Sequence, residues 1–228
     1  SKNELELLNV WKDEIPAEVF TETFTPPITD GSGNDRKNLL KAKEILEKEG
    51  WFVENGKLVK DGKEFKFEFL IVSPSDEKIA LAYQSNLKKL GITMDVRTVD
   101  SSQYQERLLS YDFDMIKRYW GVSLSPGNEQ QFYWGSEVGQ KDGSRNYPGI
   151  NSPAVDALIE KLISATNREE LTTAIHALDR VLLWGHYVVP LYHSNKDRIA
   201  YWDFFEYPDE IPLYGIVIES WWINKDKQ

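Results

Sequence analysis

Apolar residues recur every three to four positions in several stretches of the chain, which is the spacing of a helix with one buried face. This periodicity predicts helices over residues 4–15, 36–49, 76–90, 101–108, 152–162 and 168–184. Glycine readily adopts the left-handed conformation that ends a helix, and it follows three of these stretches at Gly50, Gly91 and Gly185. These predicted helices therefore have a defined end as well as a buried face.

Short apolar runs between the helices predict strands. Residues 65–72 alternate between apolar and polar at first and then become wholly apolar, which is typical of a strand covered on both faces. Further strands are predicted over residues 51–53, 57–59, 92–99, 113–119, 188–192 and 198–202. The pair Asn55-Gly56 predicts a hairpin between the first two of these. From residue 65 to 119, the alternation of strand and helix predicts an α/β fold with a helix-covered mixed sheet and right-handed crossovers.

Residues 120–151 interrupt this rhythm with a long irregular segment that contains many glycine, serine and aromatic residues. Long loops in compact domains are usually functional or disordered, and rings such as Trp120, Tyr133 and Trp134 argue against disorder. Because ligand crevices of α/β domains open beyond the carboxyl ends of strands, these rings are candidates for stacking on a ligand. The alternative interpretation, weighted about equally, is that they fill the core.

Polar residues of the same segment complete the candidate pocket. Asn128, Gln130, Arg145 and Asn146 add amide and guanidinium groups to the rings, a combination that suits peptides or sugars. For Arg145 two interpretations stay open, because its planar fork can hold a ligand carboxylate or form a structural salt bridge.

The balance of charge excludes several classes of partner. The 228 residues include 27 Lys+Arg and 37 Asp+Glu, a formal net charge of −10, whereas nucleic acids and anionic membrane surfaces attract basic patches. No apolar run approaches the ~18 residues that a membrane-spanning helix needs. With no cysteine, the chain has no disulfide, no thiolate zinc site and no cysteine nucleophile. Its length fits one large domain, or one domain and part of another.

No motif commits the chain to catalysis. His176, His186 and His193 match no metal-ligand spacing, and residues 121–125 resemble a nucleophile elbow that lacks its second glycine. We therefore expect no cofactor, no metal and no enzymatic activity. The separation of a glycosidase's two carboxylates depends on the fold and cannot be read from a sequence. A carbohydrate-binding or glycoside-hydrolysing protein that uses the Trp-rich loop thus stays as an alternative.

Short characteristic runs extend in order over nearly the whole chain. They include Asp114–Ile116, Trp120-Gly121, Leu124–Gln130, Tyr133–Ser136, Gly143–Asn146, Gly149-Ile150, Pro153–Asp156 and Trp184–Pro190. In these runs the sequence resembles the oligopeptide/dipeptide/nickel family (family 5) of bacterial solute-binding proteins, and more narrowly its Yej-type branch. The resemblance implies a periplasmic receptor, its signal peptide removed, that closes two lobes around a peptide and delivers it to an ABC permease.

The resemblance also implies how the chain is organised. Residues 1–202 correspond to the C-terminal ligand-binding lobe of a class II periplasmic-binding-protein fold. Residues 203–228 correspond to a tail that in the family returns to the N-terminal lobe, which is missing here. The chain is thus expected to be a fragment that supplies one wall of the cleft. A ligand-sensing lobe of a transcription regulator is a further alternative.

Some site residues carry over from the family. Trp120 matches a tryptophan at a strand end that contacts the ligand backbone, and Tyr192 or His193 matches an aromatic contact near the hinge. Ser123 stands where the better-known oligopeptide receptors have an aspartate that holds the peptide's amino group, so amine anchoring is expected to differ. The predicted ligand-binding residues are Trp120, Ser123, Asn128, Tyr133, Trp134, Arg145, Tyr192 and His193.

Overall fold

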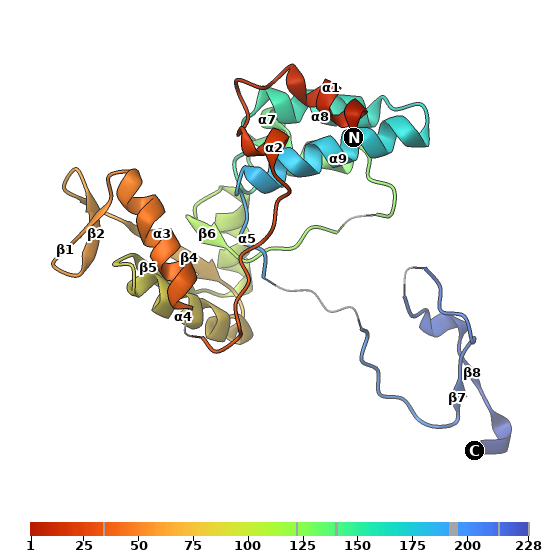
Figure 1. Cartoon of the computed structure of the whole chain (residues 1–228). Helices are drawn as coiled ribbons and strands as arrows, with labels where there is room; N and C mark the ends of the chain where they lie inside the picture. Colours follow the sequence, from red (N-terminus) through yellow and green to blue (C-terminus); the bar gives the residue numbers. More distant parts are fainter. Residues whose placement is uncertain (34, 122, 140, 192–195, 214, 228) are drawn as a thin grey trace. The chain divides into compact units, whose positions relative to one another are not determined.

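The computed structural model describes residues 1–33, 35–121, 123–139, 141–191, 196–213 and 215–227 (Figure 1). The chain divides into two compact units, Ser1–Tyr187 and Val188–Gln228, and each is described by itself. Within the described residues, no helix combines the length and the apolar character that crossing a membrane requires.

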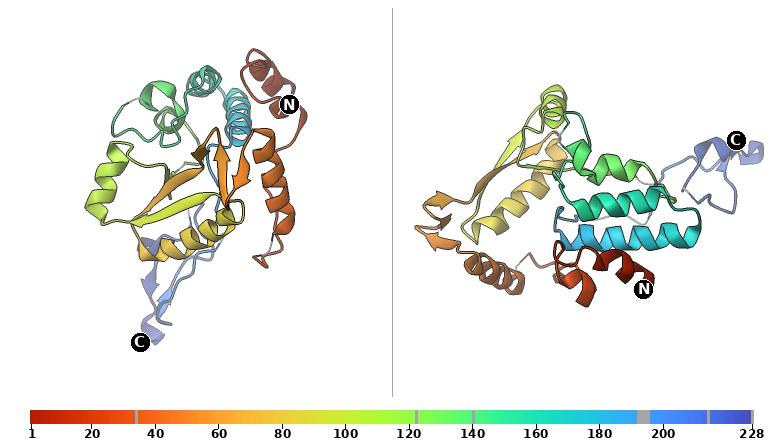
Figure 2. Two further views of the ribbon diagram at one scale, coloured as in Figure 1. Left: turned by 90° about the vertical axis from the view of Figure 1, so that its left-hand side faces the viewer. Right: turned by 90° about the horizontal axis from the view of Figure 1, so that it is seen from above.

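A three-stranded parallel sheet organises part of the first unit. Its middle strand β4 (Lys66–Ile71) pairs in parallel with β5 (Thr93–Thr98) on one side and with β6 (Met115–Ile116) on the other. Helix α4 (Pro74–Lys88) connects β4 to β5, and helix α5 (Ser101–Leu109) leads from β5 towards β6 (Figure 2). This alternation confirms the predicted α/β fold.

Successive side chains of β4 pack on opposite faces of the sheet. Phe69 and Ile71 pack with Ala80 of α4, whereas Leu70 packs with Leu108 of α5. Because neighbouring residues of a strand point to opposite faces, a strand that is covered on both sides needs an unbroken apolar run. The run at the end of β4 meets this requirement.

Strand β6 is shorter than the predicted strand 113–119. It is a strand of 2 residues, and both pair with β4. Directly before it, Oδ2 of Asp114 accepts a hydrogen bond from the backbone N–H of Glu68 at 2.8 Å. A side chain thus takes the place of a backbone partner, which ends the ladder at this point.

A separate antiparallel sheet contains the predicted hairpin. Its strands are β1 (Phe52–Glu54), β2 (Lys57–Lys60) and β3 (Lys63–Glu64). Asn55 and Gly56 connect β1 and β2 with φ angles of 50° and 80°, the left-handed conformation that a tight hairpin turn uses. The backbone N–H of Leu58 donates to the carbonyl of Gly91 at 2.7 Å. The strands expected in one mixed sheet therefore form two sheets with a single type of pairing each.

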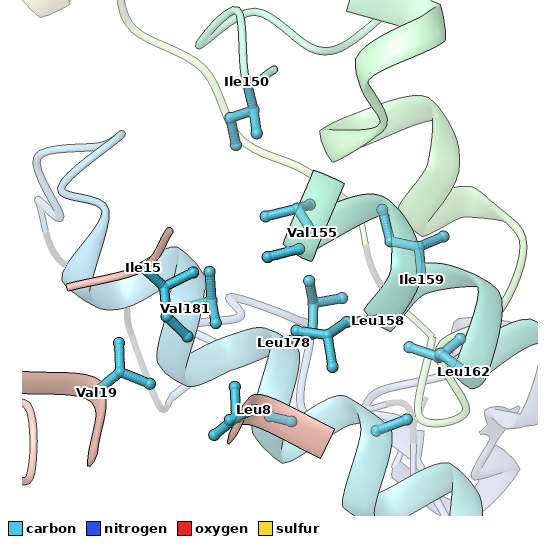
Figure 3. Close-up of a cluster of buried hydrophobic side chains, with 13 residues drawn as sticks. Leu8, Ile15, Val19, Ile150, Val155, Leu158, Ile159, Leu162, Leu178 and Val181 are labelled. Atoms are coloured by element: carbon cyan, nitrogen blue, oxygen red, sulfur yellow. The ribbon is translucent and has the colours of Figure 1, made fainter. Parts of the chain in front are cut away.

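Helices supply an extensive second core in the first unit. They are α1 (Lys2–Asn9), α2 (Glu18–Thr21), α8 (Pro153–Ile163) and α9 (Arg168–Trp184). Figure 3 shows apolar side chains that these helices place together, among them Leu8, Val19, Val155, Leu158 and Leu178, all at most 3% exposed. Helix α3 (Arg36–Lys48) precedes the hairpin and is capped by the Asp35 side chain.

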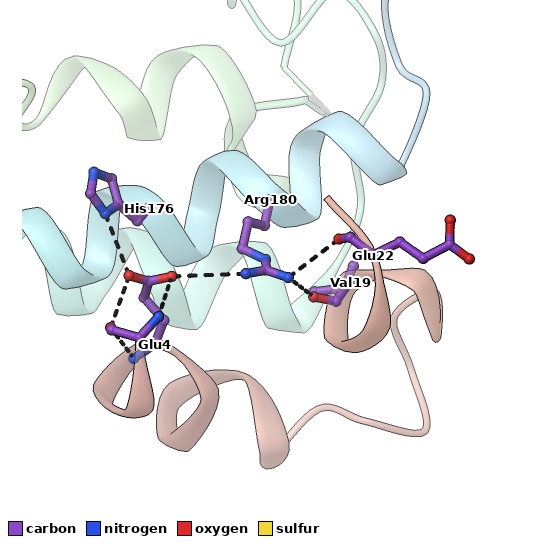
Figure 4. A network of polar contacts seen from close by, with 6 residues as sticks. Glu4, Val19, Glu22, His176 and Arg180 are labelled. Carbon is purple, nitrogen blue, oxygen red and sulfur yellow. Dashed lines mark hydrogen bonds and ion pairs between the residues drawn. The ribbon is translucent and has the colours of Figure 1, made fainter. Parts of the chain in front are cut away.

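Polar contacts join α1 to α9 beside this core (Figure 4). The carboxylate of Glu4 lies 3.5 Å from Nδ1 of His176 and 4.0 Å from Nη1 of Arg180. It also accepts a hydrogen bond from the Ser1 hydroxyl at 2.8 Å. Burial acts to raise the pKa of Glu4, but these hydrogen bonds and the charge of the chain's amino group outweigh it, so the pKa lies below 4.5. His176 thus lies in a contact between helices.

The second unit contains little regular structure. Strands β7 (Phe205–Glu206) and β8 (Trp222–Ile223) pair antiparallel, and two 3₁₀ helices, η1 (Ile218–Ser220) and η2 (Lys225–Lys227), accompany them. The rings of Tyr201, Tyr207 and Trp221 pack together, with the centroids of Tyr201 and Trp221 5.0 Å apart. The boundary predicted at residue 202, and the role of the tail, stay predictions.

The two strands predicted in this unit are wrong for the residues that the structure describes. Neither 188–191 nor 198–202 forms a strand, and residue 192 lies outside the described residues. Aromatic and β-branched residues favour a strand only where a neighbouring strand takes their backbone hydrogen bonds. Among the described residues, no strand pairs with these segments.

Candidate ligand-binding surface

The candidate surface begins where the chain leaves β6. The carboxyl ends of parallel strands lie along one edge of a sheet, and residues 117–120 follow β6 at that edge. Lys117 forms an ion pair with Asp76, which lies in the first turn of the helix after β4. The ends of β4 and β6 are therefore held together.

Trp120 is half-buried in a group of aromatic rings. Its ring centroid lies 4.9 Å from that of Trp134 and 6.4 Å from that of Tyr147. Its indole Nε1 donates to the backbone carbonyl of Arg145 at 3.4 Å. We term Trp120, Trp134 and Tyr147 the aromatic platform. It joins the end of the sheet to the irregular segment that follows.

The guanidinium group of Arg118 lies over the ring of Tyr147. Cζ of Arg118 lies 5.2 Å from the centroid of the Tyr147 ring, and Nη2 of Arg118 donates to the Tyr147 hydroxyl at 3.3 Å. The Tyr147 ring also packs near Tyr111 and Phe113, with centroids 6.2 and 6.5 Å away. Sequence analysis singled out neither Arg118 nor Tyr147, although Arg118 stands two residues before Trp120.

Tyr133 and Trp134 belong to α6 (Glu129–Trp134) and contribute to packing. Tyr133 is 6% exposed, and its hydroxyl donates to the carbonyl of Gly121 at 3.0 Å. Trp134 packs partly against the helical core, and its Nε1 donates to Oε1 of Gln130 at 2.9 Å. A ligand contact through either ring stays a prediction.

The polar candidates Ser123, Asn128 and Arg145 are exposed. Oγ of Ser123 donates to the carbonyl of Ser125 at 2.7 Å and accepts from its N–H at 3.2 Å, which fixes a local turn. Asn128 precedes α6, but its side chain makes no capping hydrogen bond. Tyr192 and His193 lie outside the described residues.

Asn146 supports the segment from inside instead of facing a ligand. Its side chain is 0% exposed, and Nδ2 donates to the carbonyls of Gly135 and Ile150 at 3.0 and 2.8 Å. Its Oδ1 accepts from the N–H of Ile150 at 2.9 Å. Gln130 is also buried and accepts the Trp134 indole hydrogen bond. Two amides expected in the pocket therefore bind the protein itself.

Two titratable groups near the platform have pKa values shifted from their usual range. Burial raises the pKa of the Tyr111 phenol. Burial also acts to raise the pKa of Glu129, but hydrogen bonds from the backbone of Gly127, from its own backbone and from the Gln130 side chain together outweigh it and lower the pKa. Among the described residues, no three histidine or carboxylate side chains come together as metal ligands. Tyr111 and Glu129 both take part in hydrogen bonds in this region.

Two hollows in the structure are lined by residues other than those of the platform. One of about 620 Å³ is lined by residues of α1, α8 and α9 and of the α8–α9 connection. Another of about 220 Å³ lies within residues 197–221. Neither of these two hollows includes a residue of the platform.

Comparisons with known proteins identify a matching family and several relatives of the sequence. Residues 11–142 match the family described as bacterial extracellular solute-binding proteins, family 5, middle region. The uncharacterised protein y4wM of Sinorhizobium fredii is 49% identical over 222 residues, which cover 96% of this chain and 34% of the relative. The probable peptide-binding protein YejA of Agrobacterium fabrum is 42% identical over 225 residues, 97% of this chain and 37% of the relative. The chain thus spans about a third of the length of these curated relatives.

Solved structures agree in fold. The oligopeptide-binding protein AppA of Bacillus subtilis, in complex with a nonapeptide, matches with a TM-score of 0.60 at 24% identity, over 81% of this chain and 38% of its own. The periplasmic binding protein MelB of Agrobacterium fabrum, in complex with stachyose, matches with a TM-score of 0.55 at 19% identity, over 75% and 30%. At these identities the likeness shows the fold alone.

The sequence match identifies the family, and the fold is consistent with it. The likeness of fold confirms the predicted lobe of a periplasmic-binding-protein fold. Relatives that carry a functional name, such as YejA, are named as binding proteins. The matched region covers more than half of the residues. The chain belongs to family 5 of the bacterial extracellular solute-binding proteins.

Proposed function

We propose that the chain is the C-terminal lobe of a periplasmic receptor that captures peptides and delivers them to an ABC permease. The peptide would lie between this lobe and an N-terminal lobe outside the chain. The length of the relatives, about three times that of the chain, leaves room for such a lobe. The relative YejA, named as a probable peptide-binding protein, supports the choice of peptide.

The aromatic platform carries this proposal. It lies at the carboxyl-end edge of a parallel sheet, where α/β domains bind ligands, in a chain of a solute-binding family. Trp120 is only half-buried, so part of its ring remains for stacking on an apolar side chain or a peptide group. The surface binds by contact, and no reaction is assigned to it.

A peptide on this wall would be held mainly through its backbone. An extended ligand offers N–H and C=O groups at every residue, so strand-like hydrogen bonds give affinity with little sequence preference. Water in roomy side-chain pockets allows different residues to fit. Ser123 brings a hydroxyl and no negative charge, so this position holds a peptide amino group more weakly than a carboxylate would.

The test uses the full-length receptor purified from cells. Mass spectrometry of the co-purifying solute should detect peptides, and calorimetry with such a peptide gives the dissociation constant. In that receptor, Trp120→Ala should weaken binding about tenfold, because a stacked ring contributes on the order of 1.4 kcal/mol. Tyr119→Ala is the matched control, because this neighbouring side chain is 87% exposed.

Two results would count against the proposal. Co-purification of sugars alone would replace peptide as the solute, and unchanged affinity of the Trp120→Ala receptor would remove the platform from the site. The isolated chain should bind the same peptide far more weakly than the receptor, since it supplies only one wall. Micromolar or tighter binding by the chain alone would contradict the two-lobed part of the proposal.

A further inference from the structure

Two arginines, Arg118 and Arg145, belong to the segments that form the aromatic platform. Among the described residues, neither Arg118 nor Arg145 forms an ion pair. By contrast, Arg107 lies 2.8 Å from carboxylate oxygens of both Glu68 and Asp112. In a chain with a net charge of −10, acidic partners are abundant. Exposed arginines elsewhere in the described part of the chain, such as Arg168, also lack an ion pair, so it is their position beside the aromatic platform that sets Arg118 and Arg145 apart.

Both arginines contact rings of the aromatic platform. Arg118 lies on the Tyr147 ring, and the backbone of Arg145 accepts the hydrogen bond of the Trp120 indole. The rings of Tyr147 and Trp120 are themselves neighbours, with centroids 6.4 Å apart. Arg118 thus adjoins the proposed peptide site through its guanidinium group, and Arg145 adjoins it through its backbone.

Arg118 is held in place before any ligand binds. One of its N–H groups donates to the Tyr147 hydroxyl, which leaves most of the five guanidinium donors for other acceptors. Tyr147 is fixed by its ring neighbours, of which Tyr111 bonds through its hydroxyl to Ser144. A cation held on a firm ring loses less side-chain entropy when it pairs with an anion.

Three acidic side chains of the segments around the platform have partners of their own. Asp76 pairs with Lys117. Glu129 accepts the backbone hydrogen bond of Gly127, and Asp114 accepts that of Glu68. Among the described residues, none of these three carboxylates forms an ion pair with Arg118 or Arg145, so the N–H donors of both arginines remain open to a ligand carboxylate.

We propose that Arg118 and Arg145 form a subsite beside the aromatic platform for a carboxylate on a side chain of the bound peptide. The receptor would then prefer peptides with glutamate or aspartate over neutral peptides. This inference rests on the proposed function and adds a solute preference to it. Guanidinium groups favour carboxylates because their parallel N–H donors match the two oxygens.

The test compares two peptides that differ only in charge. Acetyl-Ala-Glu-Glu-Ala-amide and acetyl-Ala-Gln-Gln-Ala-amide have blocked ends, so terminal charges play no part. Titration of the ¹⁵N-labelled chain, followed by NMR, measures weak binding and reports on the Arg Nε–H groups directly. The acidic peptide should bind about fivefold more tightly, as expected for exposed ion pairs. The preference should shrink at about 0.5 M salt, where screening is strong.

Variants assign the preference to the two arginines. Arg118→Gln and Arg145→Gln should each reduce the ratio of the two affinities, and together they should bring it to about one. Arg168→Gln is the matched control, because Arg168 is an exposed arginine at the start of α9 and has no ion pair among the described residues. It should leave the ratio unchanged.

The outcomes separate this inference from the proposed function. Equal binding of both peptides, with shifts around Trp120, would overturn the acidic preference and leave peptide capture standing. Glutarate serves as a probe without a peptide backbone. If glutarate shifts the Arg118 and Arg145 signals while neither peptide shifts Trp120, the anion subsite stands and peptide capture fails. If glutarate and the acidic peptide leave both arginines unshifted, the subsite is refuted.

Discussion

Asn146 shows how a single buried amide holds the irregular segment in shape. Its side chain is fully buried and pairs with three backbone groups, two of them on Ile150 and one on Gly135. Asn146→Ala leaves these groups without partners, and each unpaired buried group costs roughly 1–3 kcal/mol. We expect the free energy of unfolding to fall by about 3 kcal/mol, measured as a lower urea midpoint with unchanged slope.

Asn128 is the matched control for this prediction. It is exposed and makes no capping hydrogen bond, so Asn128→Ala should change the free energy of unfolding by less than about 0.5 kcal/mol. Equal stability of the two variants would show that the bonds of Asn146 contribute nothing net.

At the residue scale, the sequence showed which residue types gather but not which way they face. Trp120 was predicted from its place after a strand, and its half-buried position is compatible with that role. Asn146 was expected to face a ligand, yet it lies inside. Burial depends on contacts between distant segments, such as the ring contact of Arg118 with Tyr147, and no local pattern contains them.

At the element scale, Gly91 links the end of α4 to the hairpin sheet. Its φ of 80° is left-handed, and a Cβ at this position would lie 2.8 Å from the backbone nitrogen of Leu58. Gly91→Ala therefore adds a backbone clash to the conformational cost, and should break the hydrogen bond between the two residues. We expect a loss of about 3 kcal/mol in the free energy of unfolding, measured by thermal and urea denaturation.

Substitution of Gly56 measures the conformational cost without the backbone clash. Gly56 has the same φ of 80°, but a Cβ there would meet no atom within 4 Å. Gly56→Ala should therefore lose only about 1 kcal/mol, the cost of the left-handed conformation alone. If both variants lost the same amount, the contact between Gly91 and Leu58 would have no energetic role.

Elements with local signals were predictable, and elements that depend on a partner were not. Asp35, Ser152 and Asn167 cap the helices that periodicity predicted, because a cap is a contact within a few residues. The strands at 188–192 and 198–202 had a suitable composition. Composition does not specify a neighbouring strand. Among the described residues, no strand pairs with the backbone of these segments.

At the scale of the whole molecule, the second unit leaves much apolar surface in water. Leu213 is 84% exposed, Trp202 73% and Ile211 63%. The cluster of Tyr201, Tyr207 and Trp221 covers only part of the unit's aromatic content. Apolar groups that remain exposed favour association, so this unit is expected to contact a second chain when no other lobe covers it.

Sedimentation of the chain at increasing concentration tests this expectation. The unaltered chain should shift from monomer to a larger species, whereas a variant with Trp202→Ser, Ile211→Ser and Leu213→Ser should stay monomeric, because the buried apolar area is lost. Ile28→Ser with Val10→Ser is the control, since these side chains are 82% and 77% exposed in the first unit. That variant should associate like the unaltered chain. A chain that remains monomeric at every concentration would refute association through the second unit, and loss of association in the control alone would transfer the contact to the first.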